Sequence, residues 1–196
     1  MRELFRKSYR TPNDIFLEQS LARLGYIATA AAGDRLAGFA IGETRVMDLP
    51  NLPSQAVALA GICCVAPDFR RRGLFQELER LAFQAAGISA PRLLSCGRVA
   101  HPASFRTISW NPTHVPKRGI PPTAWQREIG AVLAEVLGAS GFDPETFVCH
   151  GGGRPMHPIL DLDVAPEEWD VFRAVNRDRG DAVLGLCWIP DAPEGW

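Results

Sequence analysis

The hydrophobic pattern of the N-terminal half alternates between helical and strand-like spacing. Apolar residues recur at helical spacing from Asn13 or Asp14 to Leu24, and Gly25 follows as a stop signal. Two apolar runs, 26–32 and 36–47, then flank a short Gly-containing turn, which predicts a β-hairpin. The core-facing positions of the first helix are expected to be Ile15, Leu17, Leu21 and Leu24.

The next segment predicts a strand, a turn, a helix and a second strand. A loop at 50–54 precedes an almost continuous apolar run, Ala56 to Val65, which is typical of a strand buried on both faces. Helical spacing returns from Gly73 to Ala86 and stops at Gly87, and residues 91–96 predict another strand.

The hydrophobic spacing of the C-terminal half is less regular, but it still predicts helices and strands. The expected elements are a short helix at 101–108, a proline-rich loop at 111–122, a helix with apolar positions from Trp125 to Leu137, a strand at 146–149, a turn at 151–153, a helix at 166–176 and a strand at 182–189. A hairpin combined with a parallel strand–helix–strand crossover predicts an α/β fold around one mixed sheet flanked by helices. The 196 residues are expected to form a single domain.

Composition narrows the classes of function. Lys and Arg total 21 against 22 Asp and Glu, so we expect no broad basic face for nucleic acid or an anionic membrane. The cysteines are odd in number and lack a C-x-x-C pair, which is typical of reduced thiols. With no secretory leader and no apolar run of membrane-spanning length, a soluble cytoplasmic protein is expected.

The segment from Gly61 to Leu78 carries the clearest chemical signal. A buried strand leads into the turn Arg70-Arg71-Arg72-Gly73, where a helix begins. The unpaired N–H groups of a first helical turn and its partial positive charge favour a phosphate, and guanidinium groups pair with phosphate oxygens. Gly73 allows close approach of the backbone to such a ligand. The alternative interpretation is a solvated basic turn before a surface helix.

This segment resembles the signature of the GNAT superfamily of N-acetyltransferases, Val-x-Pro-x-(Tyr/Phe)-(Arg/Gln)-x-x-Gly-x-(Gly/Ala). The matching residues are Val65, Pro67, Phe69, Arg70 and Gly73, whereas Phe75 departs from the final small residue. The resemblance is specific over 56–86 and extends in element order over 13–96.

The resemblance implies a GNAT-like mixed sheet, here without the strand that usually precedes the first helix. It implies one acyltransferase domain, with an acyl-CoA-binding core at 13–108 and a part at 109–196 that completes the sheet or the acceptor site. Acetyl-CoA would be the co-substrate, with no metal. The implied cofactor-binding residues are Cys63, Cys64 and Val65 for the pantetheine arm, and Arg70, Arg71, Arg72, Gly73, Leu74 and Phe75 for the pyrophosphate.

Acetyl transfer to an amine needs a proton acceptor, a stabilised oxyanion and a leaving thiolate. The candidate bases are Glu43, at the end of the second hairpin strand, and His101, after the strand that ends near Cys96. Each also has a structural interpretation, as a solvated strand-end charge or a helix-start residue. A strand bulge near Cys64 or Val65 would free a backbone N–H for the oxyanion.

The thiolate's proton donor is the weakest part of the assignment. Relatives commonly use a Tyr on the helix after the fifth strand, but the tyrosines of this chain, Tyr9 and Tyr26, lie elsewhere. Ser104 and His101 are the hydroxyl and imidazole available there. Because a thiol has a pKa near ~8.5, its thiolate also leaves tolerably without a donor.

The sequence therefore predicts an N-acetyltransferase that acts on an amine of a small molecule or peptide. A CoA-binding sensor or interaction module without catalysis is the alternative. An unrelated enzyme that uses Cys149 and His150 is a third possibility, although neighbouring strand residues point to opposite faces. No nucleic acid or membrane partner is expected, and 109–196 could also form a homodimer contact.

Overall fold

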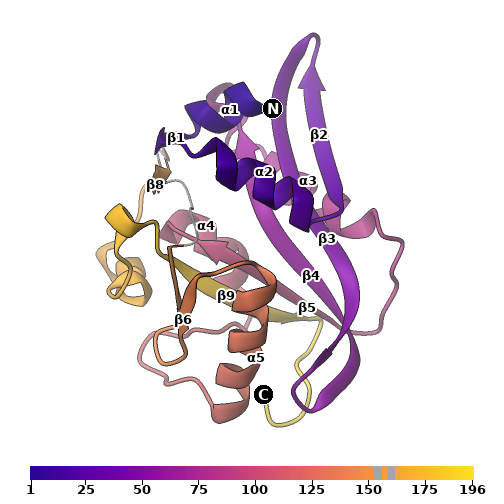
Figure 1. Ribbon diagram of the computed structural model, residues 1–196, viewed down its shortest axis with the longest axis vertical. Coiled ribbons are helices and arrows are strands. Elements are labelled where there is room, and N and C mark those ends of the chain that lie inside the picture. The colour runs from indigo at the N-terminus through magenta and orange to yellow at the C-terminus, as the bar shows by residue number, and fades with distance from the viewer. Residues whose placement is uncertain (152–155, 159–161) are drawn as a thin grey trace.

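A seven-stranded mixed sheet forms the centre of the protein (Figure 1). The computed structural model describes residues 1–151, 156–158 and 162–196, with backbone alone for 156–158. In spatial order the strands are β2 (Tyr26–Ala32), β3 (Arg35–Leu49), β4 (Leu52–Val65), β5 (Leu93–Val99), β9 (Ala182–Ile189), β7 (Val148–His150) and β6 (Gly141–Asp143). The prediction of an α/β fold around one mixed sheet is confirmed.

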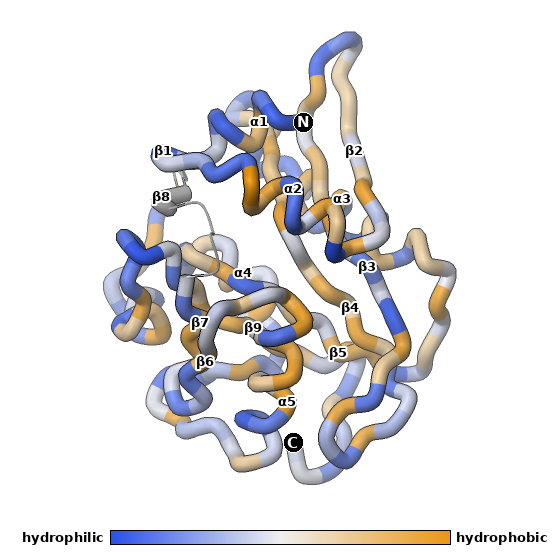
Figure 2. Tube along the Cα trace, in the orientation of Figure 1, coloured by the Kyte–Doolittle hydropathy of each residue, from blue (hydrophilic) through white to orange (hydrophobic). Residues whose placement is uncertain are grey.

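Helices cover both faces of this sheet. They are α1 (Arg2–Lys7), α2 (Asp14–Arg23), α3 (Leu74–Gln84), α4 (Pro102–Ser109) and α5 (Ala124–Val136), together with 3-10 turns η1 (Pro67–Phe69), η2 (Pro166–Phe172) and η3 (Arg177–Arg179). Figure 1 shows α2 and α5 in front of the sheet and α3 and α4 behind it. Hydrophobic residues concentrate along β4, β9 and α5, whereas the turn between β2 and β3 is hydrophilic (Figure 2).

At the edges of the main sheet, the strands do not follow one another in the order of the sequence. β1 (Tyr9–Thr11), which precedes α2, pairs with β8 (Met156–Pro158) in a separate two-stranded sheet. Within the described residues, β2 therefore has a partner on one side only, β3. At the other end, β9, β7 and β6 bring the C-terminal part of the chain into the main sheet.

Local chemistry explains where the helices begin and end. The Asn13 side chain accepts a hydrogen bond from the N–H of Ile15 and caps α2, and His101 caps α4 in the same way. Thr123 and Gln126 form a reciprocal capping box at the start of α5. Gly87 adopts a left-handed φ of 66° after α3, the conformation that glycine accommodates at helix ends.

Several boundaries differ from the sequence prediction. The loop expected at 50–54 is a tight turn at Pro50 and Asn51, and β4 already begins at Leu52. β5 extends to Val99 because it pairs along its whole length with β9. Where an α-helix was expected at 166–176, residues Pro166–Phe172 form the 3-10 helix η2 and no helix follows to 176, and β6 was not expected at all.

One core position of α2 was also predicted incorrectly. Ile15 is 64% exposed, whereas its neighbour Phe16 is 4% exposed and lies in the main core. Helical spacing alone allows either residue to start the apolar stripe, and packing against the sheet selects Phe16. Leu17 and Leu24 are buried as predicted. Of the turn expected at 151–153, only Gly151 lies within the described residues, with a φ of 47°.

In the described part of the chain, every helix is too short or too polar to cross a lipid bilayer.

Candidate functional site

The central feature of the site is a wedge between two parallel strands. β4 and β5 pair in register from Val57 with Leu94 to Ala60 with Gly97. Beyond these pairs β4 continues to Val65 and β5 to Val99, and a cavity of about 490 Å³ lies between them. We call the Ala60–Gly97 end of this wedge its closed end.

A β-bulge in β4 marks this closed end. Ala40 lies opposite Cys63 and Gly42 opposite Ala60, so Gly61 and Ile62 together face Ile41 alone. The bulge expected near Cys64 or Val65 therefore occurs slightly earlier in the strand. Gly61 permits it, because a Cβ there would lie 2.5 Å from the Leu24 side chain and 2.8 Å from the Ile41 carbonyl oxygen.

Backbone donors nevertheless face the cavity at the positions that the sequence indicated. The N–H of Ala66 donates to the carbonyl of Ala37 at 2.8 Å, on the β3 side of the strand. N–H groups point alternately to either side of a strand, so those of Cys63 and Val65 point away from β3 and toward the wedge. Divergence from β5, rather than a bulge, makes these donors available.

The Arg-Gly turn lies at the open end of the wedge. Arg70 and Arg71 line the cavity with Gly73, Leu74 and Phe75, whereas Arg72 does not. Gly73 precedes α3 with a left-handed φ of 75°, and its missing Cβ faces open space. The first N–H groups of α3 have no acceptor within the helix, as at any helix start. The turn thus presents backbone donors and two guanidinium groups to the cavity.

Two of these arginines are held by their neighbours. The Nε of Arg70 donates to the carbonyl of Val65 at 3.1 Å, which fixes the turn against the end of β4. Arg72 stacks over the ring of Phe69, with its guanidinium carbon 6.0 Å from the ring centre. Arg72 thus packs on Phe69, while its own side chain is not part of the cavity lining.

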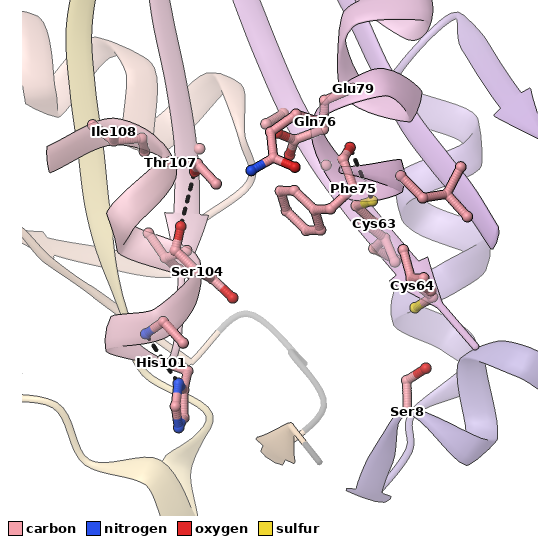
Figure 3. A pocket seen from close by; sticks show the side chains of 18 of the residues that line it. Ser8, Cys63, Cys64, Phe75, Gln76, Glu79, His101, Ser104, Thr107 and Ile108 are labelled. Atoms are coloured by element: carbon pink, nitrogen blue, oxygen red, sulfur yellow. Dashed lines mark hydrogen bonds between the residues drawn. The ribbon is translucent and has the colours of Figure 1, made fainter. Parts of the chain in front are cut away.

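The remaining walls come from both faces of the sheet. α3 contributes Gln76, Glu79 and Phe83, α4 contributes Ser104, Thr107 and Ile108, and the α1–β1 segment contributes Ser8 and Tyr9. Figure 3 shows Phe75 directed into the cavity from one wall and Ser104 facing it from the other. The Thr107 hydroxyl donates to the Ser104 carbonyl at 2.8 Å.

His101 lines the cavity, but its imidazole already has a structural role. Its Nδ1 accepts a hydrogen bond from the N–H of Ala103 at 3.1 Å, which caps α4. Burial, aided by Arg177 and Arg106, lowers the pKa of His101 and favours the neutral ring. With Nδ1 accepting, the proton resides on Nε2, so this atom is a hydrogen-bond donor rather than a base.

Glu43 lies outside the cavity lining. It is 9% exposed, accepts a hydrogen bond from the Gly25 N–H at 2.7 Å and forms an ion pair with Arg45. The structure therefore brings together the predicted cofactor-binding residues other than Arg72, with His101 and Ser104, and places Glu43 in a separate contact.

The two cysteines of β4 remain protonated thiols. Burial, with the charge of Glu79, raises the pKa of Cys63 well above its ordinary value, and burial raises that of Cys64 to about 11. The Cys63 Sγ lies 3.9 Å from the Phe75 carbonyl oxygen, so β4 contacts the first turn of α3 here. These residues act as walls of the cavity rather than as nucleophiles.

Among the described residues, Glu79 is the one acidic side chain that lines the cavity, and the sequence interpretation did not single it out. Burial raises its pKa to about 8, although the residue keeps partial access to the cavity. Its spacing from Gln76 and Phe83 places all three on one face of α3. That spacing was the available signal, but the sequence does not reveal that this face borders a cavity.

Cys149 and His150 do not form a site together. Cys149 is buried in the main core, whereas the His150 ring lies beside Arg179 and Asp181. Within the described residues, no three His, Cys, Asp or Glu side chains gather as metal ligands would.

No protein-family model and no curated protein matches the sequence. The interpretation of the site therefore rests on its geometry. The arrangement suits an elongated ligand with an anionic group at the turn and amide groups along β4.

Proposed function

We propose that this protein is an acyl-CoA-dependent N-acyltransferase with a GNAT-like fold, which transfers an acetyl group from acetyl-CoA to an amine. The observation that carries the proposal is the wedge between β4 and β5, which has a cavity of about 490 Å³ and the Arg70–Gly73 turn at its open end. This volume falls within the range of roughly 300–1,000 Å³ typical of small-molecule sites.

The shape of the wedge suits the chemistry of acetyl-CoA. Its pyrophosphate would meet the backbone donors at the start of α3 and the guanidinium of Arg71. The amide groups of its pantetheine arm would pair with the N–H groups of Cys63 and Val65, as an added strand does. From Val65 to Gly61 the strand spans about 13 Å, so an extended arm would bring the acyl group toward the closed end.

The chain's own groups supply part of the transfer chemistry. The walls align the donor and exclude water, and such alignment alone removes several kcal/mol from a barrier. A backbone N–H that faces the wedge is suited to stabilise the oxyanion that develops when the amine attacks. The Ser104 hydroxyl faces the cavity from α4 and is suited to hydrogen-bond the departing sulfur (Figure 3).

A binding experiment with matched variants tests the cofactor assignment. Isothermal titration calorimetry should detect acetyl-CoA binding to the wild type, and Gly73→Glu should abolish it by placing negative charge where the pyrophosphate sits. Gly87→Glu is the control, because Gly87 has a similar left-handed φ, 66° against 75°, and open space around its Cβ position, but lies at the other end of α3. Absence of binding to the wild type at millimolar acetyl-CoA would refute the proposal.

A CoA-binding module without catalysis is the second candidate. It is favoured by the occupied Nδ1 of His101 and by the position of Glu43 outside the cavity, which leave both predicted bases in structural roles. Release of free thiol from acetyl-CoA, measured across a panel of primary amines, separates the two functions. Amine-dependent release would exclude the non-catalytic module.

A further inference from the structure

Two contacts locate the Glu79 side chain along the wedge. One turn before it on α3, Phe75 contacts Cys63 of β4. One turn after it, the Phe83 ring lies within 3.0 Å of the Cβ position of Gly42, which pairs with Ala60. Because α3 and β4 run in opposite directions, Glu79 lies level with the bulge at Gly61, at the closed end.

In the part of the chain that the structure describes, Glu79 is the acidic side chain that lines this end of the cavity. Figure 3 shows it beside Gln76 at the end of the cavity away from His101. Within the described residues, Glu79 forms no ion pair or hydrogen bond. By contrast, Glu77, on the solvent side of the same helix, pairs with Arg80.

The other titratable groups that face the cavity lie on every neighbouring element. Among the described residues they are Cys63 and Cys64 on β4, Arg70 and Arg71 in the turn before α3, Cys96 and Arg98 on β5, His101 at the N-cap of α4 and Tyr9 on β1. Arg98 is directed toward α2, with its guanidinium carbon 5.5 Å from the Phe16 ring centre. Burial keeps the thiols of Cys63, Cys64 and Cys96 protonated and His101 neutral near pH 8.

We propose that Glu79 is the catalytic proton carrier of the acyl transfer, accepting the proton of the attacking amine and returning it to the leaving thiolate. This inference rests on the proposed function. The acceptor enters as a neutral amine, having lost one proton to solvent. Its nitrogen forms the bond to the acyl carbon, the carbon–sulfur bond breaks, and the sulfur keeps that electron pair. The nitrogen's surplus proton passes to the Glu79 carboxylate and then to the sulfur, giving an amide and a free thiol.

The environment of Glu79 fits both halves of this step. Its pKa of about 8 lies close to the ~8.5 of a free thiol, so the carboxyl group can take up a proton and return it without a large energy change. Glu79 would then act both as the general base and as the proton donor, a role for which the sequence has no tyrosine in the expected position.

Proton uptake on acetyl-CoA binding tests the position of Glu79 without requiring the natural acceptor. At pH 8 the Glu79 carboxyl group is ionised in about half of the molecules. A bound pantetheine arm that displaces water beside this group would raise its pKa further. Calorimetry in two buffers of different ionisation enthalpy should therefore record uptake of up to about half a proton by the wild type. Glu79→Gln should bind acetyl-CoA within about threefold of wild type but take up none, whereas Glu77→Gln should behave as wild type.

Transfer kinetics test the role itself. With ethylamine, spermidine and a lysine-containing peptide as probe acceptors, Glu79→Gln should reduce the rate of CoA release by about 100-fold or more, and Glu79→Asp should restore part of it. The wild-type rate should rise with pH through about 8.

Each outcome has a separate meaning. If the wild type fails to bind acetyl-CoA, the proposed function is wrong. If it binds, but Glu79→Gln shows the same proton uptake or the same transfer rate as wild type, the assignment of Glu79 is wrong while the proposed function survives. If no probe amine reacts, proton uptake decides whether Glu79 adjoins the bound arm, and its absence overturns the inference. An unchanged or higher melting temperature of Glu79→Gln shows that the variant folds.

Discussion

The Glu43 carboxylate accepts a hydrogen bond from the Gly25 backbone N–H at 2.7 Å, joining β3 to the end of α2. Its other oxygen pairs with Arg45, whose guanidinium donates to the Arg23 carbonyl at 3.2 Å. The contact thus satisfies an N–H and a carbonyl where the helix ends. A residue that resembles a candidate base in the sequence is here part of the connection between a helix and the sheet.

Glu43→Ala should therefore destabilise the fold by about 2 kcal/mol, because it leaves the Gly25 N–H and the Arg45 charge without their acceptor. Urea unfolding measures the change, and acetyl-CoA affinity should stay the same. Glu18→Ala is the control, since Glu18 forms an exposed ion pair with Arg2 and its loss should cost under about 1 kcal/mol. A stable Glu43→Gln protein that binds acetyl-CoA but has lost transfer activity would instead favour a catalytic role.

His101 should make stability fall in mildly acidic solution. Burial, with Arg177 and Arg106, lowers its pKa in the folded state, so the unfolded chain binds a proton more readily. Stability from this group is present above the unfolded pKa of about 6.5 and is lost as pH falls from there toward the folded value. His101→Asn keeps a good helix cap without a titrating group, and should reduce this pH dependence in urea titrations.

His114 provides the comparison for that measurement, because burial lowers its pKa as well. The slope that remains in His101→Asn should diminish again when His114→Gln is added. A wild-type stability that is flat between pH 7 and pH 5 would contradict the neutral, capping state of His101.

The regular elements could be predicted because local pattern and tertiary packing agree there. The hairpin of β2 and β3 has two apolar runs around a turn at Gly33, and α5 has an apolar stripe that ends at Gly138. β6 and β7 were harder, since each has only three residues and β7 joins the sheet through β9, which is distant in sequence. The start of β4 was not predicted, because the local sequence around Pro53 favours a loop.

The candidate site was predictable only where one continuous segment forms it. The Arg-Gly turn and the end of β4 are adjacent in sequence, so the motif places them together. Glu79 could not be identified in this way, because its character depends on the divergence of β4 from β5 and on α4 closing the other wall. Glu43 was chosen for its position at a strand end, but its partners, Gly25 and Arg45, become apparent only in three dimensions.

Gly61→Ala should be strongly destabilising at the closed end of the wedge. A Cβ there would lie 2.5 Å from the Leu24 side chain and 2.8 Å from the Ile41 carbonyl oxygen, and the backbone oxygen cannot move without disturbing the bulge. We expect a loss of about 1–3 kcal/mol in urea unfolding. Gly141→Ala is the matched control, because its Cβ would make only an ordinary contact of 3.4 Å with His150. Equal stability of the two variants would show that the bulge is not as tightly packed as described.

Acetyl-CoA should protect Cys63 from alkylation. Cys63 is the half-buried cysteine and lines the cavity, whereas Cys187 is buried on the α4 side of the sheet. Burial raises the pKa of both thiols, that of Cys187 to about 11, so iodoacetamide should react slowly with each at pH 8 and faster as pH rises. Mass spectrometry should find Cys63 modified first, and saturating acetyl-CoA should slow that reaction at least tenfold while leaving Cys187 unchanged. Rapid modification of Cys63 at neutral pH would contradict its raised pKa. A lack of protection when calorimetry shows binding would place the bound arm away from β4.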